Sequence, residues 1–121
     1  MGGKHKFIER ALELAQKSEH NKFKHGAVIV KGTKVISEAP NKYFSNVPVP
    51  GVSSIHAEHN AIKSSRRSVK GCDIYIARYA SYGAAMSKPC ERCQIILRNM
   101  GIRKAYYTNS CGFIMETMNI N

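Results

Sequence analysis

The chain has 121 residues and a formal net charge of +11, from 19 Lys and Arg residues against 8 Asp and Glu residues. This length indicates a single domain over residues 1–121 with a substantial core. No apolar run approaches the roughly 18 residues of a membrane span, and no apolar segment follows the N-terminal basic residues to form a secretion signal. We therefore expect no membrane partner and a cytoplasmic, intracellular and reducing location.

The first half of the chain predicts a helix, a hairpin and a long loop. Apolar residues recur at helical spacing over residues 6–18. Residues 26–30 and 34–38 are predicted strands, separated by a turn that contains glycine. Residues 39–54 contain three prolines and a glycine, which favours a loop. Structureless loops of this length are usually functional or disordered, and we expect this one to line or cover a pocket.

The second half predicts two helices and three strands. The expected helices are residues 55–67 and 90–100, and the expected strands are residues 73–79, 104–108 and 113–118. Residues 80–89 are a predicted loop. Too few residues separate the last two strands for a crossover helix, so we expect them to run antiparallel. Tyr106 and Tyr107 are consecutive on a predicted strand, which predicts one side chain facing inward and one facing outward.

Two short motifs carry the chemistry of the chain. They are His56-Ala57-Glu58 and Pro89-Cys90-Glu91-Arg92-Cys93. One histidine and two cysteines are good zinc ligands, and three protein ligands leave a tetrahedral zinc with an open position, as in catalytic sites. The pattern His-x-Glu followed by Pro-Cys-x-x-Cys is typical of zinc deaminases that act on nucleobases.

The residue types suit a hydrolytic deamination. Zinc can lower the pKa of a bound water from about 15.7 to about 7, which provides a nucleophile at neutral pH. Glu58 is the only acidic residue between Glu38 and Asp73, so it is the candidate proton carrier from that water to the ring and to the departing amine. Cys90 and Cys93 share one helix face, and a helix that begins there would favour their thiolate forms.

Over roughly Phe7 to Thr108 the chain resembles the CMP/dCMP-type deaminases of the cytidine deaminase-like superfamily. The resemblance rests on the two motifs, on the apolar stretch Gly26–Val30 and on Asn41, which follows the second predicted strand. It implies an α/β fold with three α/β/α layers and a mixed central sheet of about five strands. It also implies a homo-oligomer.

The same resemblance implies roles for individual residues. The zinc ligands would be His56, Cys90 and Cys93, with Glu58 as the catalytic residue. Substrate-binding groups would come from Asn41 and from the backbone around Ala57, Ser87 and Lys88. The implied cofactor is Zn²⁺, and the implied partner is a free nucleotide or nucleoside such as dCMP or CMP, converted to the uracil product and ammonia.

Other interpretations of the motifs remain open. His56, His59, Cys90 and Cys93 could form a closed structural zinc site, although that leaves Glu58 without a role. A thiol nucleophile with a histidine base and a redox Cys-x-x-Cys are further alternatives. The substrate could also be a base in single-stranded DNA or RNA, or the chain could be a non-catalytic zinc-stabilised binding module.

The basic surface also has two interpretations. The tightest cluster of positive charge comprises Lys63, Arg66, Arg67 and Lys70. Such a cluster is either a solvated surface or a field that attracts a nucleotide phosphate or a nucleic-acid backbone.

Overall fold

The computed structural model describes residues 2–18, 24–43, 54–55, 57–65, 67–80, 83–109 and 112–120. Its helices are α1 (Gly2–Gln16), α2 (Ala57–Ser64) and α3 (Glu91–Asn99). Its strands are β1 (Lys24–Lys31), β2 (Lys34–Pro40), β3 (Lys42–Tyr43), β4 (Ser54–Ile55), β5 (Asp73–Ala80), β6 (Gly83–Ala85), β7 (Lys104–Asn109) and β8 (Gly112–Asn119). None of these helices has the length and apolar character needed to span a bilayer.

The main sheet has the strand order β2-β1-β5-β7-β8, with β6 paired to β5 outside this path. Strand β1 is antiparallel to both of its neighbours, β5 and β7 are parallel, and β7 and β8 are antiparallel. The sheet is therefore mixed, as predicted, and the antiparallel pairing of the last two strands is confirmed.

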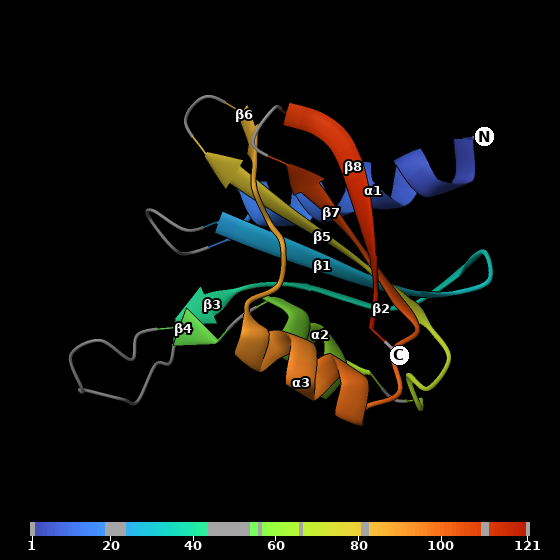
Figure 1. Cartoon of the computed structure of the whole chain (residues 1–121). Helices are drawn as coiled ribbons and strands as arrows, with labels where there is room; N and C mark the ends of the chain where they lie inside the picture. Colours follow the sequence, from blue (N-terminus) through green and yellow to red (C-terminus); the bar gives the residue numbers. More distant parts are fainter. Residues whose placement is uncertain are drawn as a thin grey trace.

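Helices cover both faces of this sheet. Helix α1 lies on one face, and α2 and α3 lie together on the other (Figure 1). Each face has its own cluster of buried apolar side chains. This arrangement confirms the three-layer α/β/α fold.

Strand β1 shows how the sequence builds the two cores. Ala27 and Ile29 pack in the cluster that includes α2 and α3, whereas Val28 and Val30 pack in the cluster beneath α1. Alternate residues of a strand point to opposite faces, so a run of five small or branched apolar residues supplies both layers.

The expectation for Tyr106 and Tyr107 was wrong. The two side chains do point to opposite faces, but both are buried, at 3% and 7% exposed. The reason is that β7 lies between two covered faces, so neither direction leads to solvent.

Two short ladders lie in segments that were predicted as loops. Strands β3 and β4 pair antiparallel at the base of the predicted loop over residues 39–54, whose residues 44–53 lie outside the described part of the chain. Strand β6 pairs antiparallel with the end of β5 inside the predicted loop over residues 80–89. This return strand directs the chain from β5 toward the start of α3.

Candidate active site

Helix α2 brings Glu58 to its junction with α3. Ala57 and Ala61 are fully buried, and these small side chains allow the helix to lie close to the sheet. The Ser37 hydroxyl donates a hydrogen bond to the carbonyl of Ala61 at 2.7 Å, which fastens the helix to β2. Glu58 lies in the first turn, where a carboxylate interacts favourably with the helix dipole, and it is only 6% exposed.

Helix α3 carries both cysteines of the second motif at its N-terminus. Cys90 is the N-cap residue, has an extended backbone and accepts a hydrogen bond from the Gln94 amide at 2.9 Å. The Gln94 side chain also donates to the carbonyl of Pro89 at 2.8 Å, which fixes the entry to the helix. Cys90 is exposed, whereas Cys93, one turn later, is 5% exposed.

The two helices bring a carboxylate and two thiols together. Cys93 forms side-chain hydrogen bonds with Glu58 and with Cys90. Burial raises the pKa of the Cys93 thiol well above its ordinary value, and the Glu58 carboxylate and the neighbouring Cys90 raise it further. The carboxylate of Glu58 and the thiols of Cys93 and Cys90 therefore form one polar cluster at the helix N-termini, in which Glu58 and Cys93 are buried and Cys90 is exposed.

The donor chemistry of this cluster fits a zinc ion. Thiolates are preferred zinc ligands. A bound cation would lower the pKa of Cys93, which is raised in its absence, and would favour the thiolate. Cys90 and Cys93 are two of the three predicted ligands. His56 lies outside the described residues, and without it the described part of the chain contains no group of three or more His, Cys, Asp and Glu side chains that could hold a metal ion. The position of the third predicted ligand therefore stays a prediction.

Ser87 anchors the segment that leads into the Cys90 motif. Its hydroxyl donates to the carbonyl of Ile76 at 2.7 Å and accepts from the Thr108 amide at 2.8 Å, while its own amide donates to the carbonyl of Thr108 at 2.9 Å. The Thr108 hydroxyl donates to the carbonyl of Ala85. Ser87 is 3% and Thr108 is 1% exposed, so this network ties the approach to α3 onto β5 and β7 inside the protein.

Asn41 occupies a comparable junction directly after the end of β2. Its side-chain oxygen accepts hydrogen bonds from the Ser18 hydroxyl and from the His25 amide, the latter at 2.9 Å. The backbone N–H of Asn41 donates a hydrogen bond to the carbonyl of His25 at 3.0 Å. Asn41 is 3% exposed and therefore joins the end of α1 to β1 and β2, whereas its predicted contact with a substrate stays a prediction.

The remaining predicted substrate-binding residues lie beside the cluster in the chain. Ala57 is the first residue of α2, and Lys88, which is exposed, lies two residues before Cys90. Sequence reasoning missed Thr108 because nothing in a single inward-facing threonine reveals a partner in a distant loop. It also missed Ser18, whose role depends on the position of the end of α1 relative to Asn41.

Comparisons with known proteins agree with this arrangement. The sequence profile of the cytidine and deoxycytidylate deaminase zinc-binding region matches residues 1–109. An uncharacterized deaminase in the luxG 3' region of Aliivibrio fischeri is 27% identical over 110 residues, which cover 84% of this chain and 69% of that protein.

Solved structures with the same fold include two deaminases. The dCMP deaminase of cyanophage S-TIM5 in apo form has a TM-score of 0.70 and 25% identity, with 92% of this chain and 86% of that chain covered. The same phage enzyme in complex with dCMP and dUMP has a TM-score of 0.68 and 24% identity, with coverage of 88% and 81%. The cytidine deaminase of Burkholderia pseudomallei has a TM-score of 0.68 and 20% identity, with coverage of 96% and 91%.

The profile match covers far more than half of the chain and includes both motifs, and helices α2 and α3 meet where Glu58 contacts Cys93. The chain therefore belongs to the cytidine and deoxycytidylate deaminase family.

Proposed function

We propose that this protein is a zinc-dependent hydrolytic deaminase of cytosine in a free nucleotide or nucleoside, of the dCMP or CMP kind. The reaction consumes water and yields the uracil product and ammonia. The observation that carries the proposal is the buried contact between the Glu58 carboxylate and the Cys93 thiol where α2 and α3 meet. The similarity to a phage dCMP deaminase solved with dCMP and dUMP supports the choice of substrate.

The burial of Glu58 and its contact with Cys93 support its proposed role as the proton shuttle. Its carboxylate accepts a proton from the attacking water and delivers it to the ring nitrogen next to the amine-bearing carbon. It then transfers the second proton of the water to the leaving amine, which departs as ammonia. Burial of Glu58 keeps bulk water from competing for these protons.

Cys90 and Cys93, with His56, would hold the zinc. When bound, zinc lowers the pKa of its water ligand toward neutrality. Both cysteines lie at the N-terminus of α3, where the helix dipole favours negative charge on the two sulfur atoms. Asn41, Ala57, Ser87 and Lys88 are proposed to border the substrate, through backbone groups in the last three cases.

The proposal is tested by incubating zinc-loaded protein with a substrate panel and measuring a one-dalton mass gain. The panel contains cytidine, CMP, dCMP, dCTP, adenosine, guanine and a mixed-sequence single-stranded oligonucleotide. The Glu58→Gln variant, purified in parallel, controls for contaminating deaminases. Conversion of a free cytosine species by the wild type alone is the expected result.

Two other outcomes would replace the proposal. Conversion of the oligonucleotide alone would assign the chemistry to a base in single-stranded nucleic acid. Absence of any conversion, with zinc bound and the protein folded, would favour the non-catalytic zinc-stabilised module.

A further inference from the structure

The open edge of the main sheet carries a groove beside the C-terminal end of α2. Strand β2 is an edge strand, and the groove lies between its first half and the end of α2. Its volume is about 470 Å³. The lining residues that matter here are Lys34, Val35, Glu38, Ser64 and Arg67, which we call the edge groove.

Positive charge dominates the edge groove. Lys34 and Arg67 are both exposed along it. Among the described residues of the lining, Glu38 alone is acidic, and its carboxylate accepts hydrogen bonds from the Arg10 guanidinium, one of them at 2.8 Å from Nε. The Arg10 guanidinium neutralises this carboxylate, so the two cations of the groove are not cancelled by it.

The positive charge continues beyond the groove around the end of the sheet. Lys31 is the direct cross-strand partner of Lys34 and is also exposed. Val30, the neighbour of Lys31, is the cross-strand partner of Asp73, and Lys70 lies three residues before Asp73 in the chain. Lys70 is exposed as well. This end therefore collects basic residues from the β1–β2 turn and from the segment after α2.

We propose that the edge groove and the adjoining Lys31 and Lys70 bind the phosphate backbone of single-stranded nucleic acid. A recessed groove with cations on its wall matches a flexible polyanionic chain, whereas a flat anionic bilayer contacts a flat or convex surface. The described lining of the groove contains hydroxyl groups and an exposed valine, and none of its side chains is aromatic. Without a stacking platform, the binding should be independent of base sequence.

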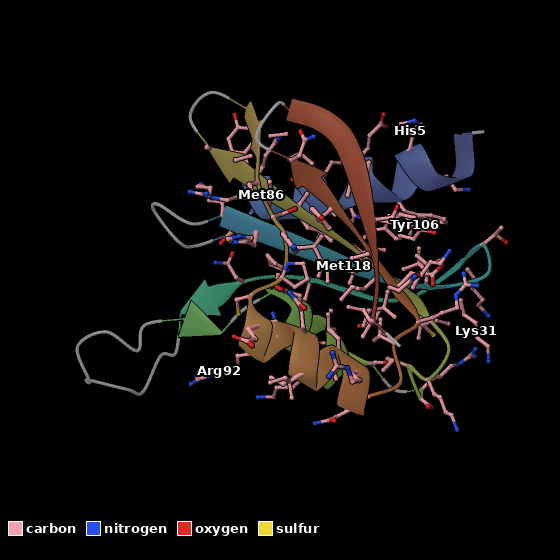
Figure 2. The ribbon with its side chains drawn as sticks, viewed as in Figure 1. His5, Lys31, Met86, Arg92, Tyr106 and Met118 are labelled. Carbon is pink, nitrogen blue, oxygen red and sulfur yellow. The ribbon has the colours of Figure 1, made fainter. Side chains whose placement is uncertain are left out.

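This surface is separate from the proposed catalytic site. Glu58 lies in the first turn of α2 and Ser64 is its last residue, six residues later, which is about 9 Å along the helix axis. Figure 2 shows Lys31 at one side of the molecule and Arg92, in the first turn of α3, at the other. The inference is therefore independent of the proposed deamination.

The test compares two double variants that each remove two positive charges from exposed positions. Lys34→Gln/Arg67→Gln changes the edge groove, and Lys6→Gln/Lys17→Gln changes exposed positions of α1 and the residue that follows it. Fluorescence anisotropy with a labelled, mixed-sequence single-stranded DNA of 20 nucleotides gives the affinity between about 50 and 200 mM NaCl, the range over which phosphate contacts are salt-sensitive. Anionic vesicles of phosphatidylserine and phosphatidylcholine are assayed in parallel by sedimentation.

We expect the wild type and the α1 variant to bind the DNA with similar, steep salt dependence. Each lost phosphate contact removes about 0.7 from the slope of log K against log salt for a single strand, so the groove variant should lose about 1.4. Oligonucleotides of dT and dA should bind alike. The deamination rate on free dCMP should be the same in the groove variant as in the wild type, so the two proposals fail separately.

Three results would overturn the inference. Equal losses of DNA affinity in both double variants would show that the binding depends on net charge alone. A clear preference for one base would assign it to a site with base readout. Binding to vesicles without binding to DNA would identify the surface as a membrane contact.

Discussion

At the residue scale, buried hydroxyl groups hold the loops from which the candidate active site is built. The Ser87 hydroxyl donates a hydrogen bond to the carbonyl of Ile76, and the Thr108 hydroxyl donates one to the carbonyl of Ala85. The two hydroxyl oxygens lie 2.9 Å apart, and the Thr108 amide donates to Ser87. This network fixes residues 85–87, so that the chain reaches Cys90 from a defined direction.

Removal of the Thr108 hydroxyl should loosen this approach. Thr108→Val keeps the shape and strand propensity of the side chain but leaves the carbonyl of Ala85 without this donor in a buried position. We expect a loss of about 1–3 kcal/mol in the free energy of unfolding, measured by urea denaturation. Thr108→Ser, which restores the hydroxyl, should recover part of the loss.

Thr117→Val is the matched control, because Thr117 is exposed on the neighbouring strand β8. It should change the free energy of unfolding by no more than about 0.5 kcal/mol. Similar losses in Thr108→Val and Thr117→Val would show that the buried network does not contribute to stability.

The sequence indicates the reactive residues, but it does not indicate the hydrogen bonds that hold the surrounding segments in place. The spacing and residue types of the two motifs predicted Glu58, Cys90 and Cys93 as site residues. In the structure Cys93 contacts both Glu58 and Cys90 at the junction of α2 and α3. The partners of Ser87 and Asn41 come from segments distant in sequence. Their hydrogen bonds depend on strand register and on where α1 ends, which no local pattern encodes.

At the scale of elements, the contact between α1 and β1 depends on a missing side chain. A Cβ atom on Gly26 would lie 2.0 Å from the carbonyl oxygen of Ala11 and 2.7 Å from the backbone nitrogen of Ala15. These are backbone atoms of α1, so relief would require movement of the whole helix. The glycine that opens the apolar stretch of β1 is therefore a packing requirement.

Gly26→Ala should consequently destabilise the protein severely. Overpacking typically costs about 1–3 kcal/mol, and we expect at least about 3 kcal/mol here because the clash is with backbone. Loss of folded protein or a large fall in the melting temperature would be the measured result. Gly3→Ala in α1 is the control, and it should be neutral or stabilising by up to about 1 kcal/mol. A Gly26→Ala protein as stable as the wild type would contradict the close packing of α1 on β1.

The layer beneath α1 also contains a stack of aromatic rings. The rings of Tyr75 and Tyr106 lie 4.6 Å apart between centroids at an angle of 10°, and the ring of Phe7 lies 5.3 Å from that of Tyr75. Tyr75 is 3% exposed. Burial raises the pKa of its phenol to about 12, with smaller contributions in the same direction from Tyr106 and Asp73.

This shift predicts alkaline destabilisation with a definite sign. The unfolded chain loses the Tyr75 proton near pH 10, while the folded protein retains it until about pH 12. Above pH 10 the unfolded state binds fewer protons, so the free energy of unfolding should fall as the pH rises from about 10 to 12. Urea denaturation across this range should show a smaller fall in Tyr75→Phe than in the wild type. Equal slopes in the two proteins would show that Tyr75 is not the group responsible.

At the scale of the whole molecule, the sequence predicted the fold class and the order of most elements. Hydrophobic periodicity indicated the first helix, a glycine-containing turn indicated the first hairpin, and loop length decided the direction of the last strand, whereas the family resemblance implied the three-layer fold. The pairing of β6 with β5 was not predicted, because three small residues have no strand signal of their own. The burial of both Tyr106 and Tyr107 was also not predicted, since coverage of both sheet faces is a property of the assembled layers.

Zinc should connect the two helices of the site and so stabilise the molecule. Removal by 1,10-phenanthroline should lower the melting temperature, because a ligand at 100 times its dissociation constant stabilises by about 2.7 kcal/mol. Addition of zinc should restore both stability and activity. The variant Cys93→Ser should bind less zinc, as measured by mass spectrometry of the metal, whereas Cys72→Ser, at a buried thiol outside the cluster, should retain it. Equal zinc contents in these two variants would contradict the proposed ligands.

The most direct test of the account is the turnover of Glu58→Gln, measured together with its zinc content. The proposed role of Glu58 as proton shuttle predicts a fall in kcat of about 10²–10⁴-fold on the substrate that the wild type converts, with zinc per chain unchanged. Glu9→Gln, at an exposed carboxylate of α1, should retain both activity and zinc. A Glu58→Gln protein that turns over at the wild-type rate, or one that loses zinc in proportion to its activity, would contradict that role.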